Sequence, residues 1–146
     1  MKFVSSANSL DSFEFAILGY GQTTQSWRDR NRLQCRFSTL WKQQADTQSA
    51  RLHTWEVKRL LTGLRSLWNK ATNQVALTFS EPGLSMHARA LSDDSYRLQI
   101  QLGHNLTPSW HAYPDFPVEM DIVMSRKQLQ EAIKDLSGQI ETYPER

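Results

Sequence analysis

The sequence has a single cysteine among 146 residues. Cys35 alone excludes an internal disulfide and any metal site built from several thiolates. A chain without disulfides suits a reducing compartment, so we expect the protein in the cytoplasm. Because Cys35 alternates with Leu33 and Phe37, we expect it to face the core as a small apolar residue rather than to react as a thiol.

Long apolar runs are also missing. Polar residues follow Met1 to Val4 at once, which leaves no room for the apolar centre of a signal peptide. Nothing in the sequence approaches the ~18 apolar residues of a membrane-spanning segment. The sequence therefore predicts neither a cleaved export signal nor a membrane partner.

The net charge is only +2, but it is unevenly distributed. Residues 1–70 hold eleven Lys or Arg against five Asp or Glu, and residues 71–146 hold six against ten. The densest basic stretch runs from Arg28 to Arg36, beside Trp27. Cations bind phosphates and an indole can stack on a base, so a nucleic-acid-binding module is one alternative. The nearly balanced total charge and the lack of an RNA-binding signature favour a solvated or protein-contacting segment instead.

Catalytic motifs are absent from the sequence. It contains no Gly-x-Ser-x-Gly elbow, no Ser-x-x-Lys and no glycine-rich phosphate loop. The four histidines show neither metalloprotease spacing nor pairing with cysteine, and surface or interface roles are the more ordinary ones. They are His53, His87, His104 and His111. We therefore expect a protein that is not an enzyme, with no catalytic residue, no cofactor and no metal ion.

The composition is that of a folded chain. Five Trp, four Tyr and six Phe, with 39% apolar residues, set it apart from disordered sequences. A chain of this length can bury a hydrophobic core without disulfides or bound metals. No repeat or linker divides it, so we predict a single domain over residues 1–146.

Alternating apolar and polar residues predict six strands. They cover residues 13–20, 33–37, 75–79, 84–91, 96–102 and 116–124. The segment 42–51 is polar and has three Gln, so we expect a mobile loop there.

Two apolar stripes with helical spacing predict two amphipathic helices. The first runs from Val57 to Trp68, with Thr54 as the expected N-cap. The second follows a capping box made by Ser125 and Gln128. The predicted fold is α+β: a single antiparallel sheet of about six strands with two helices packed on one face, in the order β-β-α-β-β-β-β-α.

The other face of that sheet is polar and is our candidate for binding a partner. Glu119 and Asp121 share it, and an acid–base pair there is one interpretation. Cross-strand pairing with arginines is the simpler one. The loop near Trp110 also has residues favoured at protein interfaces. The candidate partner-binding residues are Arg36, Arg89, Arg97, Gln99, Gln101, Glu119, Asp121, Trp110 and Tyr113. An open sheet face can also pair in a homodimer, and the sequence leaves this open.

Four short motifs resemble those of the WapI-type immunity family. The motifs are a first strand ending in Tyr20, Asp29-Arg30-Asn31-Arg32-Leu33, Phe79-Ser80-Glu81-Pro82-Gly83-Leu84 and a closing Tyr143-Pro144-Glu145-Arg146. Arg32 replaces the aromatic residue of the family pattern. The resemblance implies a small bacterial protein that neutralises a polymorphic or contact-dependent toxin by direct binding, without catalysis. For Asp29, Asn31, Glu81 and Pro82, turn and cap chemistry at strand ends predicts a structural role.

Overall fold

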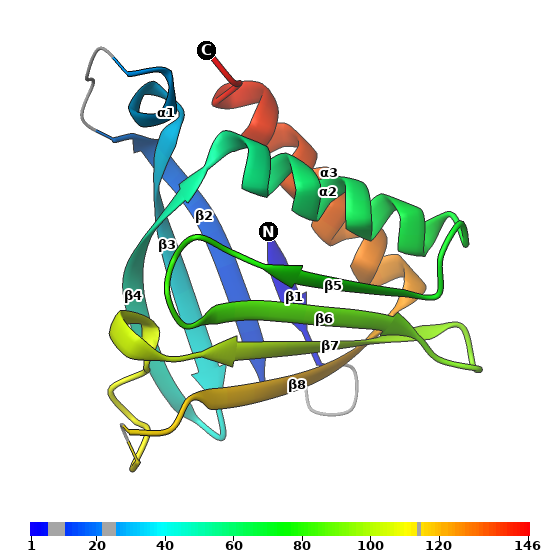
Figure 1. Cartoon of the computed structure of the whole chain (residues 1–146). Coiled ribbons are helices and arrows are strands. Elements are labelled where there is room, and N and C mark those ends of the chain that lie inside the picture. Colours follow the sequence, from blue (N-terminus) through cyan, green and yellow to red (C-terminus); the bar gives the residue numbers. More distant parts are fainter. Residues whose placement is uncertain (6–10, 22–25, 114) are drawn as a thin grey trace.

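The strands form two separate antiparallel sheets of four strands each (Figure 1). The structure is a computed structural model, and it describes residues 1–5, 11–21, 26–113 and 115–146. The first sheet has the order β1 (Lys2–Val4), β2 (Ser12–Tyr20), β3 (Arg32–Trp41), β4 (Gln44–His53). The second has the order β5 (Gln74–Thr78), β6 (Leu84–Ala90), β7 (Ser95–Leu102), β8 (Val118–Ser125).

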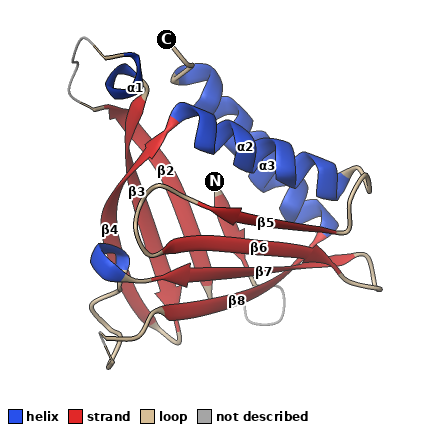
Figure 2. Cartoon of the chain, in the orientation of Figure 1, coloured by secondary structure: helices blue, strands red, loops and turns tan. Residues whose placement is uncertain are grey.

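Two long helices lie side by side and cover one end of the paired sheets (Figure 2). They are α2 (Thr54–Trp68) and α3 (Arg126–Thr142). A four-residue helix, α1 (Trp27–Arg30), precedes β3, and a short 3-10 turn, η1 (His104–Leu106), follows β7. None of the helices in the described ranges is both long enough and apolar enough to cross a membrane.

The predicted single six-stranded sheet with two helices is wrong. The described residues form two four-stranded sheets and three α-helices. Alternation shows which way a side chain points, but it does not show which strand lies beside which. The chain passes through α2 between the two sets of strands, and the apolar side of each set packs against the other set and against the helices.

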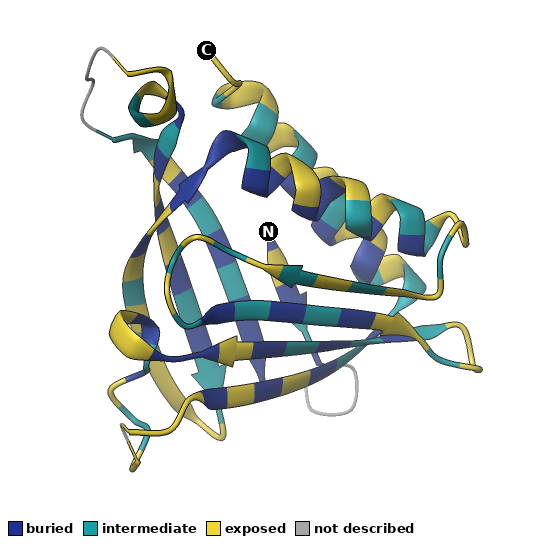
Figure 3. Cartoon of the chain, in the orientation of Figure 1, coloured by how far each residue is buried: buried dark blue, intermediate teal, exposed yellow. Residues whose placement is uncertain are grey.

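The core lies between the sheets and beneath the helices. Buried and exposed residues alternate along the strands of both sheets (Figure 3). Phe13, Phe15 and Phe37 form a cluster of rings in the first sheet, with neighbouring centroids 5.3–5.4 Å apart. Cys35 lies beside them and is 1% exposed, and burial raises the pKa of its thiol to about 12. The prediction of a buried, unreactive cysteine is confirmed at the level of burial.

The predicted loop at 42–51 is wrong, because strand β4 fills most of it. The strand pairs with β3 along its full length, and a two-residue turn joins them at Lys42 and Gln43. This strand is invisible to a hydrophobic pattern because neither of its faces is apolar near the turn. There Asp46 and Gln48 share the inward side with Ala50 and Leu52, and Asp46 is satisfied by polar groups of another segment.

The capping box of the second helix is confirmed. Ser125 Oγ accepts from the Gln128 N–H at 3.2 Å, and Gln128 Oε1 accepts from the Ser125 N–H at 2.8 Å. The first helix starts one residue earlier than expected. His53, not Thr54, is the N-cap, and the Glu56 carboxylate accepts from the His53 N–H at 2.7 Å.

One further strand was not predicted, and the ends of several predicted strands differ from those in the structure. Residues Lys2–Val4, for which no strand was predicted, form β1 and pair with β2. Strand β8 begins at Val118 rather than at residue 116. Phe116 therefore lies outside the sheet and is 68% exposed.

Candidate functional site

The outward side of the second sheet is a continuous polar surface, called here the polar face. Its residues come from β6, β7 and β8 and are in register across the strands. One row joins Ser85, Gln101 and Glu119, and the next joins His87, Gln99 and Asp121. The third row places Arg89 opposite Arg97. Five predicted partner-binding residues besides Arg89 are thus brought together here: Arg97, Gln99, Gln101, Glu119 and Asp121.

Contacts within the polar face hold some of these side chains and leave others without partners. Arg97 Nε lies 3.1 Å from Asp121 Oδ1 in an ion pair, so cross-strand pairing is confirmed for this couple. Ser85 Oγ donates to Gln101 Oε1 at 3.3 Å. Glu119 forms no ion pair in the part of the chain that the structure describes. Such an exposed, partly paired surface is typical of a contact area rather than of an acid–base centre.

Arg89 and Arg97 form a like-charge pair on neighbouring strands. Charges of one sign directly opposite each other destabilise an antiparallel pair. Asp121 neutralises Arg97, whereas Arg89 is exposed and has no ion pair among the described residues. The Arg89 guanidinium is therefore available to a carboxylate from outside the protein.

The connection between β7 and β8 brings exposed aromatic rings next to the polar face. Tyr113 is 69% exposed and Phe116 is 68% exposed. Phe116 lines a hollow of about 570 Å³ together with Ser85 and Gln101 of the polar face. The alternation pattern assigned Phe116 to a strand, and the only contrary signal in the sequence is the adjacent Pro117.

Trp110 is partly buried and is bonded to the first sheet. Its indole N–H donates to Thr39 Oγ1 on β3 at 3.2 Å, and its ring packs against the core. Next to it, Ser109 donates to Asp46 of β4 from both its backbone N–H and its hydroxyl, at 2.9 and 3.0 Å. Partial burial alone would raise the pKa of Asp46, but hydrogen bonds from Gln48 and Ser109 outweigh it and lower the pKa. These contacts fasten the β7–β8 connection to the first sheet.

Arg36 is separated from the other predicted site residues. It lies on the outward side of β3, in the first sheet, opposite Ser49 of β4. It cannot pair with Glu119 or Asp121, because they belong to the second sheet. The expectation that Arg36 shares one sheet face with them is wrong.

The basic segment from Arg28 to Arg36 is divided between α1 and β3. Arg32 approaches Asp29 at 3.6 Å, and Arg36 lies farther along β3. Trp27, which is 51% exposed, stacks on Trp55 with centroids 5.2 Å apart. Nucleic-acid binding by this segment stays a prediction.

The motif residues hold chain segments together. Asn31 is fully buried, and its amide donates to Trp27 O at 3.0 Å and to Arg146 O at 2.7 Å. The Arg146 N–H donates back to Asn31 Oδ1 at 2.7 Å. The Tyr20 hydroxyl donates to the Pro144 carbonyl. Three of the four motifs thus meet at one end of the molecule, and their residues there fasten the last residues to the first sheet.

The fourth motif borders a buried carboxylate at the start of α2. Glu56 is 3% exposed and accepts from the Ser80 N–H at 2.5 Å and from the Ser80 hydroxyl at 3.0 Å. Glu81 accepts from the N–H of Arg51 on β4 at 3.3 Å. These bonds tie the β5–β6 turn to the end of β4 and to the first turn of α2.

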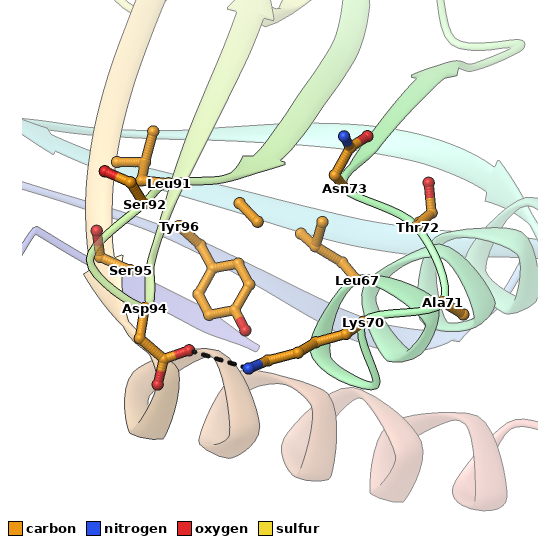
Figure 4. A pocket seen from close by; sticks show the side chains of 11 residues that line it. Leu67, Lys70, Ala71, Thr72, Asn73, Leu91, Ser92, Asp94, Ser95 and Tyr96 are labelled. Atoms are coloured by element: carbon orange, nitrogen blue, oxygen red, sulfur yellow. Dashed lines mark ion pairs between the residues drawn. The ribbon is translucent and has the colours of Figure 1, made fainter.

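A hollow lies between the end of α2 and the β6–β7 turn (Figure 4). It measures about 760 Å³. Lys70 and Asp94 face each other across it, 3.9 Å apart, and no histidine, cysteine or glutamate lines it. Elsewhere in the described residues no three His, Cys, Asp or Glu side chains are grouped as metal ligands.

Comparison with known proteins gives one match. The model of the immunity protein WapI-like family matches residues 4–144. No curated protein and no solved structure matches the chain.

Proposed function

Because the chain belongs to the immunity protein WapI-like family, we propose that it neutralises a bacterial toxin by binding the toxin domain directly, without catalysis of its own. The match over nearly the whole chain carries this proposal. A polymorphic or contact-dependent toxin is the partner that the proposal names, and the cytoplasm is where the two proteins meet.

The proposal is tested with the toxin domain encoded beside the gene. Cells that express this domain together with the protein are expected to grow, and the purified domain is expected to be retained by the immobilised protein. Growth arrest despite normal expression, together with no retention, would refute the proposal.

We assign the contact to the polar face and to Phe116. Among the residues that the structure describes, Arg89 and Glu119 of this face form no ion pair, so the face offers one cation and one anion. Phe116 adds a large exposed ring at its border. Aromatic residues and arginines contribute most to protein interfaces, so this combination suits a protein partner.

Two substitutions test the assigned surface. Arg89→Glu and Phe116→Ala are each expected to weaken toxin binding about tenfold or more, a loss of about 1.4 kcal/mol. Both residues are exposed, so the fold should not change. Isothermal titration measures the affinity. Lys127→Glu, on an exposed position of α3, is the matched control and should bind like the wild type. Unchanged affinity in both test variants would exclude this surface.

A further inference from the structure

The backbone hydrogen bonds of β4 show which of its residues face away from β3. Thr54, just past the strand, donates its N–H to Asn31 O at 2.9 Å, so even-numbered residues bond across the ladder. In an antiparallel pair the alternate residues direct both backbone groups outward. Arg51 and His53 follow this rule, since their N–H groups donate to Glu81 and Glu56 instead of to β3.

The same alternation leaves three residues with outward backbone groups along the edge of β4. They are Ala45, Thr47 and Ser49, all exposed. The Thr47 N–H contacts the carboxylate of its neighbour Asp46. For the other outward groups, no partner exists within the described part of the chain. About five residues of strand edge, roughly 17 Å, are therefore unpaired.

The other strand edges are covered in part. Strands β1 and β8 lie against each other. On β5, Arg59 of α2 donates to the Thr78 carbonyl at 2.5 Å. Natural proteins protect an open edge with lysine, proline, a bulge, an inward-pointing charge or a covering segment. On β4, the inward-pointing Asp46 and the contact with η1 protect part of the edge. Residues 45–49 contain no lysine and no proline, and β3 and β4 pair without a register shift.

Cationic side chains flank this open edge. Arg36 lies directly across from Ser49, and Arg51 lies two residues farther along β4, on the same outward side. Both are exposed, and neither guanidinium forms an ion pair within the described residues. A strand added beside β4 would place a side chain next to Ser49 and within reach of Arg51. A carboxylate at that position would complement the charge.

We propose that β4 accepts an extended segment of the toxin as a fifth strand of the first sheet, with an acidic residue facing Arg36 and Arg51. Main-chain hydrogen bonds to an exposed edge give affinity, and alternate side chains give specificity. A second copy of this chain fits less well, because its own edge residues 45–49 bring Asp46 as their one acid and that side chain points inward to Ser109. The inference rests on the proposed toxin-binding function.

Residue-resolved amide exchange on the wild-type protein tests the proposal without a variant. Ala45, Thr47 and Ser49 are expected to exchange rapidly in the free protein and to gain at least tenfold protection when the toxin domain binds. Gln48 and Ala50 should be protected in both states. If the toxin binds and the three amides still exchange rapidly, the added strand is refuted and the proposed function stands. If the toxin does not bind, both proposals fail.

Two further measurements complete the test. Ser49→Pro removes an outward N–H and no ladder bond, and it should lower toxin affinity tenfold or more while circular dichroism stays unchanged. If this variant does not fold, the amide exchange of the wild-type protein still tests the proposal. Protection of the three amides that appears without toxin and rises with protein concentration, accompanied by a dimer in light scattering, would overturn the proposal in favour of self-pairing.

Discussion

Single buried polar residues fix how distant segments meet. Asn31 was singled out in the sequence as turn and cap chemistry, and its position just after α1 agrees with this. Its bonds to Arg146, 115 residues away, were not predictable, because local sequence patterns do not show which distant carbonyl an amide will reach. Cys35 was predictable, since two apolar neighbours at alternate positions already place it in the core.

Removing the Asn31 amide should destabilise the protein. In Asn31→Ala, three hydrogen bonds to Trp27 and Arg146 are lost. We expect the free energy of unfolding to fall by about 1–3 kcal/mol, because these hydrogen bonds of a buried amide are lost. Urea denaturation measures it.

The control for this prediction is Arg146→Ala. It keeps the backbone bonds to Asn31 and loses only the guanidinium, which lies 3.8 Å above the Tyr20 ring and donates to Arg30 O. Its loss of stability should be smaller. Equal urea midpoints for Asn31→Ala and the wild type would contradict a stabilising role for the Asn31 hydrogen bonds.

At the scale of elements, the sequence located the segments with strong hydrophobic periodicity but missed a polar strand. Both long helices and four strands of the second sheet were located within about two residues. Strand β4 was missed because its inward side near the turn is polar, and the turn before it lacks the usual glycine. Lys42 and Gln43 there have φ values of 50° and 67°, which non-glycine residues seldom adopt.

That turn can be improved. A two-residue hairpin turn with two positive φ angles favours Asn-Gly. The double variant Lys42→Asn/Gln43→Gly is expected to raise the free energy of unfolding by about 1–2 kcal/mol, since left-handed backbone is costly for other residues. The hydrogen bond from the backbone N–H of Lys42 to Asp11 Oδ1 is kept, because the substitution changes only the side chain. Thermal unfolding of this variant and of Gln44→Gly compares the effects. Gln44 is the first residue of β4, so Gln44→Gly should destabilise, and a gain from it would contradict the assignment of the turn.

For the whole molecule, the number of sheets could not be predicted from the sequence. Each strand shows which of its sides is apolar, but two apolar surfaces can cover each other or be covered by helices with the same pattern. The polar face of the second sheet was nevertheless predicted residue by residue, except that Arg36 lies in the other sheet. Phe116 was missed because it continues the alternation of β8 without belonging to the strand.

One ion pair joins the first sheet to α3 and gives a test by pH. The buried amino group of Met1 contacts the Asp135 carboxylate and donates to Phe15 O at 2.8 Å. This contact lowers the pKa of Asp135 below its usual 3.8. A lowered pKa in the folded state stabilises the fold above pH ~4, and this stabilisation is lost as the pH falls through the folded value.

Asp135→Asn should therefore be less stable than the wild type near neutral pH, and the gap should narrow below pH ~4. The effect is modest because solvent screens a carboxylate that is more than half exposed. Urea unfolding between about pH 2.5 and 7 measures both curves. Glu131→Gln, also at an exposed position of α3, is the control. Its free energy of unfolding should depend on pH in the same way as that of the wild type. A gap for Asp135→Asn that does not change with pH would contradict the role of this pair.

The short open stretch of β4 has a consequence for selectivity. An isolated pairing of about five residues is marginal in water, so a stray peptide that finds this edge would soon leave it. If the toxin also contacts Arg89 of the second sheet and Phe116 beside that sheet, as proposed, it has a second attachment that a stray peptide lacks. Under these two proposals, selectivity comes from the need to make both contacts at once.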